Sequence, residues 1–522
     1  MATSAEVYFE LVELSGHVVA KGTWGATLRA NCLYQRENLA KPGRRCRLLQ
    51  GLLEITPFTP LAALDLSLGT FIQVVWLSSS AADRHPKSEA FAAIKADGSA
   101  VTWGDAGCGG DSSAVAALLT EGVVQICRGD VAFAAIKADG SVVTWGDVRG
   151  GGNSSAVATL LNEGVVQVCA SDSAFAAIKG DGSVVTWGDA CCGGDSSAVA
   201  ALLTEGVAQI CAGDMAFAAI KADGSVVTWG DASCGGDSSA VAALLTEGVI
   251  QICGNKRAFA AIKTDGSVVT WGDVDRGGNS SSQKSISRLK TRGRRTPKRT
   301  KMCPPMGVVQ VCGNAYAFAA IKADGSVLTW GYAGRGGNSS AVAALLTEGV
   351  VQICASDSAF AAIKADGSVV TWGDRNCGGD SSAVAELLTE GVVHICGGDV
   401  AFAAIKADGS VVTWGDRNCG GDSSAVAALL TEGVVQIRRS HMAFAAIKAD
   451  GSVVTWGDAD CGGDSSAVAA LLTDGVFQIC GSAMAFAAIK ADGSVVTWGE
   501  AGCGGDSSAV AALLSEGVVQ VC

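Results

Sequence analysis

From about residue 89 to its end, the chain repeats one unit ten times. Each copy carries a phrase such as AFAAIKADGSVVTWG, which stands at residues 132–146 in the second copy. A fixed period of this length is typical of units that stack and share one continuous core. Successive tryptophans of the phrase are 42 residues apart, except for one step of 59: Trp103, Trp145, Trp187, Trp229, Trp271, Trp330, Trp372, Trp414, Trp456 and Trp498.

The first half of each unit has the pattern of β-strands. In the second copy, β-branched residues at 123–126 indicate a buried strand, and 132–137 and 141–145 indicate two more. Asp139-Gly140 lies between the last two and predicts a tight hairpin turn. Gly146 then ends the third strand. Phe133 and Trp145 are the large packing residues of this hairpin.

The second half of the unit changes to a helical period. Val115, Leu118 and Leu119 are spaced to share one helical face. Asp111 or a following serine caps its start, and Gly122 suits the position just past its end. A helix this short is unstable alone, so it must lie on the neighbouring sheets. We therefore predict three strands and one short helix per unit.

These phrases resemble the regulator-of-chromosome-condensation repeat, which also occurs in HERC-type ubiquitin ligases. The resemblance covers about four-fifths of the chain and implies a β-propeller, which has seven blades in that family. Two departures matter. Family units are longer than 42 residues, with an extra strand segment where this chain has SSAVAALL, and ten copies exceed the usual four to eight blades. We predict a mostly β repeat protein, either propeller-like or an open curved array.

The two ends of the array bear on whether it closes. The first hairpin, from Phe91 to Trp103, lacks a clear strand before it, while the last copy ends with a spare strand at 518–521. The spare strand could complete the first unit. The alternative is that copying simply began and stopped at these points.

Charge and composition limit the classes of partner. The chain has 51 acidic and 38 basic residues, a net charge of −13, which argues against nucleic acid. No apolar run is long enough for a membrane span, and the first residues lack the features of a secretory leader. Sixteen of the 20 cysteines follow from the repeat and are expected to be free thiols. With only four histidines, we expect no metal site and no cofactor.

Residues 1–78 do not repeat, and a linker at 79–88 joins them to the array at 89–522. Their pattern predicts a hairpin, a helix at 27–39, a strand near 47–51 and a last strand at 70–76. This order is similar to the ubiquitin-like β-grasp fold. Because no terminal Gly-Gly follows the last strand, the resemblance implies an integral α+β domain rather than a cleavable modifier.

The fifth unit is interrupted. A segment at 282–306 replaces its helix and carries nine basic residues but no acidic one. It is either a surface insertion without packed structure or a loop for nuclear import or an anionic partner. A cytoplasmic location is expected, with nuclear import as the alternative through the basic residues of 284–301.

Two short loops vary between otherwise constant copies, one after the first strand and one after Trp-Gly. Loops on a rigid scaffold often carry binding residues, although drift at exposed positions gives the same pattern. An acid also follows nearly every Trp-Gly, which turn chemistry explains best; Tyr332 is the exception. The candidate partner-binding residues are Arg128, Asp130, Lys256, Arg257, Tyr316, Arg375, Arg417, Arg438, Arg439 and His441.

A catalytic centre needs unlike residues brought together, whereas near-identical copies supply like residues many times. We find no nucleophile–histidine–acid set, and the chain ends inside a repeat, without the catalytic domain of HERC-type ligases. We therefore predict a non-enzymatic scaffold or adaptor that binds proteins, with ubiquitin-pathway components as expected partners. The alternative is a guanine-nucleotide exchange factor for a small GTPase, as some relatives with this repeat are.

Overall fold

The computed structural model describes residues 87–279 and 307–522 continuously. In the N-terminal part it describes residues 6–13, 18–25, 45–50, 53–55, 61, 64 and 71–77. The chain divides into two compact units, residues 1–80 and 81–522. The predicted helix at 27–39 and the basic segment at 282–306 lie outside the described residues.

The first unit contains a five-stranded mixed sheet in the order β2-β1-β5-β3-β4. β1 pairs antiparallel with β2 and parallel with β5, and β3 pairs antiparallel with β5 and β4. Phe9, Leu11 and Ile72 are fully buried. Its strands are β1 (Glu6–Glu13), β2 (Val18–Gly25), β3 (Arg45–Gln50), β4 (Leu53–Ile55) and β5 (Phe71–Leu77).

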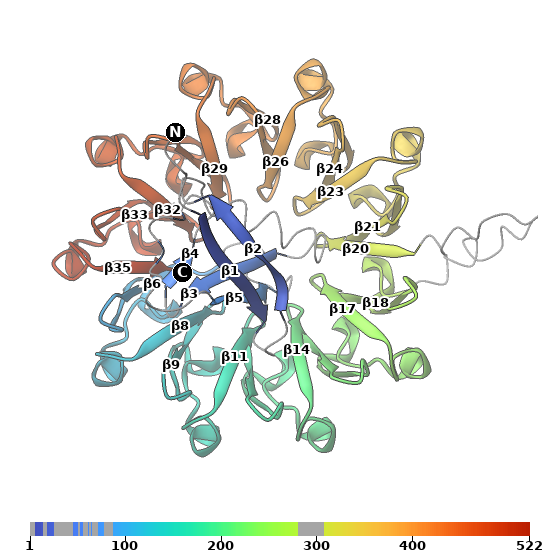
Figure 1. Ribbon diagram of the computed structural model, residues 1–522, viewed down its shortest axis with the longest axis vertical. Helices are drawn as coiled ribbons and strands as arrows, with labels where there is room; N and C mark the ends of the chain where they lie inside the picture. Colours follow the sequence, from blue (N-terminus) through green and yellow to red (C-terminus); the bar gives the residue numbers. More distant parts are fainter. Residues whose placement is uncertain are drawn as a thin grey trace, which may run out of the picture. The chain divides into compact units, whose positions relative to one another are not determined.

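The second unit is a ring of ten blades, each a separate three-stranded antiparallel sheet (Figure 1). The first strands are β35 (Val518–Val521), β8 (Val123–Arg128), β11 (Val165–Ala170), β14 (Val207–Ala212), β17 (Val249–Gly254), β20 (Val308–Gly313), β23 (Val350–Ala355), β26 (Val392–Gly397), β29 (Val434–Arg439) and β32 (Val476–Gly481), for blades 1 to 10 in turn.

The phrase AFAAIK forms the second strand of every blade, and the strand ending in Trp-Gly forms the third. The second strands are β6 (Ala90–Lys95), β9 (Ala132–Lys137), β12 (Ala174–Lys179), β15 (Ala216–Lys221), β18 (Ala258–Lys263), β21 (Ala317–Lys322), β24 (Ala359–Lys364), β27 (Ala401–Lys406), β30 (Ala443–Lys448) and β33 (Ala485–Lys490). The third strands are β7 (Ala100–Gly104), β10 (Val142–Gly146), β13 (Val184–Gly188), β16 (Val226–Gly230), β19 (Val268–Gly272), β22 (Val327–Gly331), β25 (Val369–Gly373), β28 (Val411–Gly415), β31 (Val453–Gly457) and β34 (Val495–Gly499).

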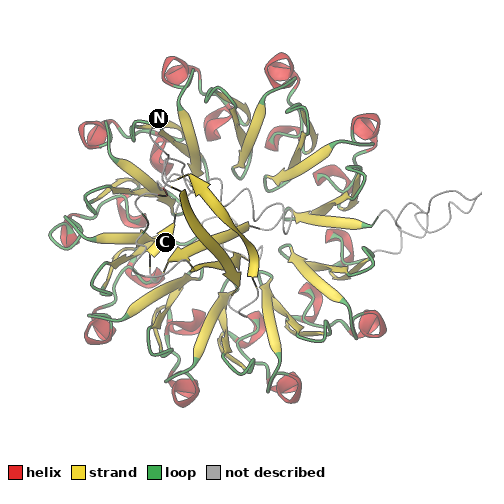
Figure 2. Ribbon diagram, in the orientation of Figure 1, coloured by secondary structure: helices red, strands yellow, loops and turns green. Residues whose placement is uncertain are grey.

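A short helical turn follows each third strand, and in every blade except the fifth, whose connecting segment lies outside the described residues, a second short helix leads to the next blade. The turns are η4 (Ala106–Cys108), η6 (Val148–Gly152), η8 (Ala190–Cys192), η10 (Ala232–Cys234), η12 (Val274–Arg276), η14 (Ala333–Arg335), η16 (Arg375–Cys377), η18 (Arg417–Gly421), η20 (Ala459–Gly463) and η22 (Ala501–Cys503). The connecting helices are η5 (Ser113–Leu118), η7 (Ser155–Leu160), η9 (Ser197–Leu202), η11 (Ser239–Leu244), η15 (Ser340–Leu345), η17 (Ser382–Leu388), η19 (Ser424–Leu429), η21 (Ser466–Leu471) and η23 (Ser508–Val510). Figure 2 shows helices along the outer edge of the ring.

The predicted helix is present but tighter than expected. It is a 3₁₀-helix, in which Val115 N–H donates to Ser112 O and Leu119 N–H to Ala116 O. The prediction that Leu118 faces the core is wrong: its exposure is 53%, and Leu119 at 2% packs inward instead, because the chain turns at the helix end. The Asp111 carboxylate accepts from Ser113 N–H, as predicted for the cap. No helix in the described ranges is long and apolar enough to cross a membrane.

The hairpin predicted at Asp139-Gly140 is confirmed. Gly140 N–H donates to Lys137 O, and Gly140 has a positive φ of 76° while Asp139 does not. The Asp139 carboxylate accepts hydrogen bonds from both the backbone N–H and the hydroxyl of Ser141. The aspartate is therefore selected for its side-chain acceptor, and the glycine for its backbone.

The joint between neighbouring blades explains why glycine, phenylalanine and tryptophan recur. Phe133 and Trp145 stack with their ring centroids 5.4 Å apart. The Trp145 indole N–H donates to Gly109 O of the preceding blade, at 3.0 Å. A Cβ on Gly109 would come within 2.6 Å of the Phe133 ring, and φ at Gly109 is 93°. Only glycine therefore lets the two blades approach this closely.

The array closes on itself, which decides between the alternatives left open by the sequence. β35 pairs antiparallel with β6, so that blade 1 contains strands from both ends of the array. Cys522 and Ala92 exchange two backbone hydrogen bonds, of 3.0 and 3.1 Å. Each sheet packs against its neighbours, yet none in the described residues extends beyond three strands of its blade. The fold is propeller-like, with ten blades rather than seven.

Candidate functional site at the hub

The loops that follow the first strands meet where successive blades converge. Asp130 N–H donates to Asp172 O, at 3.3 Å, and Asp172 N–H donates to Asp214 O, at 3.0 Å. The same contact crosses the closing joint, from Ala483 N–H to Ser88 O, at 2.9 Å. These loops, termed the hub, are residues 87–88, 129–130, 171–172, 213–214, 255–256, 314–315, 356–357, 398–399, 440–441 and 482–483.

Side chains of the hub hold the second variable loop on the same side of the ring. The Asn255 amide donates to Arg276 O at 2.7 Å, and the Asn314 amide donates to Arg335 O at 2.8 Å. The Ser440 hydroxyl makes the matching bond to Cys461 O, at 2.7 Å. The two variable loops therefore form one surface.

Lys87 lies against three aspartates from three other blades. Its Nζ is 2.9 Å from an oxygen of Asp172, 3.3 Å from Asp130 and 3.5 Å from Asp214. Burial lowers the pKa of Lys87, but the three carboxylates outweigh it and hold that pKa above its ordinary value. Burial, together with the charges of Asp214 and Asp130, raises the pKa of Asp172 to about 7. One ammonium group thus ties four blades together without neutralising the cluster.

Further ion pairs link blades elsewhere in the hub. Asp399 accepts from Arg439 at 2.9 Å and lies 2.8 Å from Nδ1 of His441, both in the next blade. Lys256 Nζ lies 3.6 Å from Asp357, two blades further on. The cation belongs to a different blade from the acid in each case, so these pairs tie blades to one another.

The candidate residues separate into groups. Lys256 and Arg439 form ion pairs in the hub, and Asp130 contacts Lys87. Nδ1 of His441 lies within hydrogen-bond distance of Asp399. Arg128 lies in β8, and its guanidinium donates to Gly481 O at 3.2 Å. The binding role assigned to these residues from the sequence stays a prediction.

The remaining candidates lie around the hub. Arg375 and Arg417 are 80% and 85% exposed, and each pairs with an aspartate of its own loop, Asp380 or Asp422. Arg438 and Arg257 are exposed. The side chain of Tyr316 packs against two guanidinium groups, from Arg276 and Arg335.

Each aspartate that follows Trp-Gly caps the turn, as predicted from turn chemistry. The Asp105 carboxylate accepts from Cys108 N–H at 2.9 Å, and that of Asp147 accepts from Gly150 N–H at 2.7 Å. Tyr332 and Glu500, at the same position, make no side-chain cap. These carboxylates are therefore occupied by the backbone. The caps come from Asp105, Asp147, Asp189, Asp231, Asp273, Asp374, Asp416 and Asp458.

The cysteines that the structure describes are free thiols, and most are buried or half-buried. Burial raises the pKa of the Cys169 thiol to about 12 and that of Cys108 to about 11. Such thiols are not nucleophiles at neutral pH. Cys108 also lies within 4.8 Å of carboxylate oxygens of Glu89 and Asp105. The Asp105 carboxylate in that group already caps its turn.

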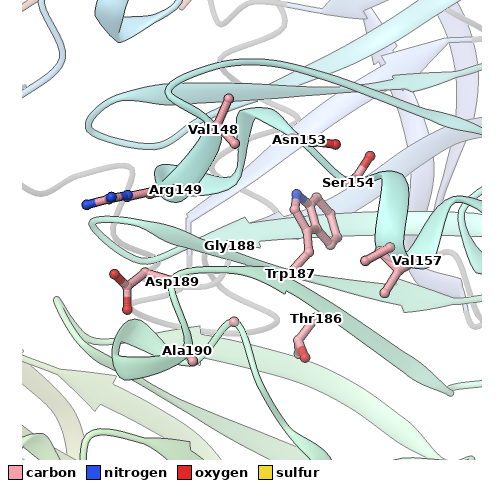
Figure 3. Close-up of a pocket in the computed structure, with 12 residues that line it drawn as sticks. Val148, Arg149, Asn153, Ser154, Val157, Thr186, Trp187, Gly188, Asp189 and Ala190 are labelled. Atoms are coloured by element: carbon pink, nitrogen blue, oxygen red, sulfur yellow. The ribbon is translucent and has the colours of Figure 1, made fainter.

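An open groove of about 530 Å³ lies between blades 2 and 3. Its lining includes the side chains of Arg149, Asn153, Thr186, Trp187 and Asp189 (Figure 3). In Figure 3 the Arg149 and Asp189 side chains lie on the same side of the groove, away from Val157. The groove has mixed polarity and little enclosure, so it suits surface contact better than capture of a small molecule.

The residues of this surface that were missed in the sequence include Lys87, Asp172, Asp214 and Arg335. Asp172 and Asp214 are in the same column as Asp130 when the copies are aligned, so a column-by-column comparison could have found them. Lys87 precedes the repeat phrase and is 85 and 127 residues from two of its partners, so nothing local in the sequence marks it.

No family model and no curated protein matches the chain. Solved structures with backbone similarity include the computationally designed protein Ika8, human WBSCR16, and Prp20p from Saccharomyces cerevisiae, which was described with its binding to Gsp1p and histones. Sequence identities are 13%, 16% and 15%, with TM-scores of 0.27, 0.31 and 0.32. The matches cover 64%, 67% and 72% of this chain, and 96%, 95% and 82% of the others. Similarity at this level carries no argument about function.

Proposed function

We propose that the chain is a non-enzymatic protein-interaction scaffold whose partner binds the hub side of the ring. One observation carries this proposal: the two loops that vary between copies lie on the same side, held together by hydrogen bonds from Asn255, Asn314 and Ser440. The rest of each blade is used for packing against its neighbours. A surface with constant geometry and variable side chains suits recognition of another protein.

A link to the ubiquitin pathway is the finer part of the proposal. It is supported by the strand order of the first unit, with parallel β1 and β5 at the centre of the sheet, and by the resemblance of the repeat to that of HERC-type proteins. The alternative, nucleotide exchange on a small GTPase, depends on the segment 282–306, which lies outside the described residues. Deleting that segment and measuring nucleotide release separates the two.

The experiment that tests the scaffold role is affinity purification of the full chain followed by mass spectrometry. One variant carries Arg257→Ala, Arg375→Ala and Arg417→Ala, three exposed changes on the hub side. The matched control carries Glu121→Gln, Glu163→Gln and Glu205→Gln, exposed residues just after the connecting helices. We expect partners to be lost from the first variant and kept by the control. Equal recovery by both variants, or equal loss, would contradict a partner surface at the hub.

A further inference from the structure

Blades 5 and 6 depart from the repeat in the turn after the third strand. Arginine stands there in place of the usual cysteine, at Arg276 and Arg335. Both guanidinium groups lie over the ring of Tyr316, with their carbons 4.5 and 4.6 Å from its centroid. This distance is typical of cation–π contact. Two positive charges are therefore held next to one aromatic ring.

Hydrogen bonds fix both guanidinium groups without burying them. Arg276 donates through Nη1 to Ala315 O at 3.2 Å, and Arg335 through Nη1 to the Ser358 hydroxyl at 2.6 Å. Both arginines are only half-buried. Their remaining N–H groups are the planar, bidentate donors that recognise carboxylates.

The two arginines differ in whether a carboxylate lies close to the guanidinium group. Nε of Arg276 lies 3.9 Å from the carboxylate of Asp273, three residues earlier. The same position before Arg335 holds Tyr332, and no carboxylate of residues 87–279 or 307–522 lies within 4.0 Å of Arg335. Blade 6 has thus exchanged an acid that would neutralise its arginine for a tyrosine.

The replacement of the acid by Tyr332 changes both the stability of the turn and the surface that it presents. Its side chain does not cap the turn, although aspartate does so in eight other blades, and it is 53% exposed. Its ring centroid is 6.5 Å from that of Tyr316. The turn has therefore lost a stabilising cap and presents an exposed aromatic ring beside a cation that has no acid of its own.

We propose that Arg335 and Arg276, flanked by Tyr316 and Tyr332, bind an acidic segment of a partner protein. This inference rests on the proposed scaffold function and names the chemistry of its partner. A carboxylate of the segment accepts from the free N–H groups of Arg335, and the Tyr332 ring packs against its aliphatic carbons. Lys256 is paired with Asp357 and leaves the cationic contact to the two arginines.

An acidic protein fits this surface better than a nucleic acid does. Base stacking needs a free aromatic face, whereas the Tyr316 ring already holds two guanidinium groups. The chain also has a net charge of −13, which repels a long polyanion but affects a short acidic segment much less.

The test measures binding of fluorescein-labelled hexaglutamate to the full chain by fluorescence anisotropy at low salt. We expect Arg335→Ala to weaken binding about tenfold, the effect of losing a charged bidentate contact. Tyr332→Asp should weaken it as much, because it restores the acid that pairs with the arginine. That variant recreates the turn of the other blades and should fold at least as well, which circular dichroism checks. The matched control, Lys490→Ala, removes a cation that already pairs with Asp474 and is not among the candidate binding residues, so it should leave the affinity unchanged.

The inference is overturned if Lys490→Ala weakens binding as much as Arg335→Ala, because the attraction would then be general. It is also overturned if Tyr332→Asp binds like the wild type, or if oligothymidine binds through Arg335 and hexaglutamate does not. Failure here is distinguishable from failure of the scaffold function. Partners recovered by affinity purification that are lost from the triple hub variant but retained by Arg335→Ala would leave the scaffold role intact and refute only this site.

Discussion

The regular order of the repeats is interrupted at two joints of the ring. These joints differ in their hydrogen bonds and in the side chains packed between the blades. At the closing joint, blades 10 and 1 come from opposite ends of the array, yet the Trp103 indole N–H donates to Gly504 O at 3.1 Å, and Leu514 is buried beside Phe91. At the joint between blades 5 and 6, the segment 280–306 intervenes. The Trp330 indole N–H there is buried without a hydrogen-bond partner in the described residues.

The cores of the two joints show the same difference. The closing joint contains the leucine that follows the connecting helix in a regular unit, Leu514. The core between blades 5 and 6 contains Phe318 and Trp330 but no such leucine among its described residues. Blades 5 and 6 follow one another in the chain, yet the described residues of their joint include no such leucine. A continuous chain between two blades therefore does not by itself supply the full set of packing side chains at their joint.

The largest effect should come from removing the closing strand. Deleting residues 518–522 exposes the edge of β6 and removes Val518 and Val521, which are both buried. Two buried valines and their backbone bonds stabilise the ring by about 4–6 kcal/mol. We expect urea denaturation to show a loss of that size. Deleting residues 284–301 is the control and should cost almost nothing; equal losses would refute the contrast between the joints.

Truncating the tryptophans compares the joints directly. Trp103→Ala and Trp330→Ala each remove a buried ring, which costs about 3–5 kcal/mol. Trp103→Ala should cost about 1 kcal/mol more, because it also breaks the hydrogen bond to Gly504. The measurement is the free energy of unfolding of the two variants under identical conditions. A larger loss for Trp330→Ala would contradict the ranking.

Repairing the weaker joint should stabilise the chain. Residues 339–348 supply the regular serine-to-glutamate segment, and they can replace 280–306 in the fifth unit. The added leucine buries about one side chain, worth about 1.5–3 kcal/mol. We expect the midpoint of urea denaturation to rise. The same replacement made with its leucine at the position of Leu346 changed to serine controls for segment length and should lose most of the gain.

A pH-dependent effect concerns the charge cluster around Lys87. The folded-state pKa of Asp172 is raised to about 7 from 3.8, so the folded chain binds this proton more tightly than the unfolded chain does. Its contribution to stability is therefore present below about pH 4 and is lost as pH rises toward 7. Asp172→Asn should gain stability relative to wild type at pH 8 but not at pH 4, in thermal melts at both values.

A control of opposite sign accompanies this prediction. Hydrogen bonds from the backbone and hydroxyl of Ser508 lower the pKa of Asp506 below its ordinary value. The stability from Asp506 is therefore lost as pH falls, and Asp506→Asn should be at its least favourable at pH 8. The same pH dependence for both variants would contradict the assignment of Asp172.

Local structure could be predicted from the sequence because its causes are local. The Asp139-Gly140 turn, the Asp111 cap and the role of the acid after Trp-Gly each depend on residues within a few positions of one another. The exposure of Leu118 could not be predicted, because it depends on the residue at which a short helix ends. Closure depends on a small rotation between units, which no single copy encodes, and the partners of Lys87 come from three different blades.

The most direct test of the closed ring is hydrogen–deuterium exchange of the C-terminal peptide 518–522. In a closed ring the Cys522 N–H donates to Ala92 O of blade 1, so the deuterium uptake of this peptide should match that of the equivalent strand 476–480. The account predicts equal protection of the two peptides. Exchange of 518–522 at the rate of an unstructured chain, with 476–480 protected, would show that the array is open and would contradict it.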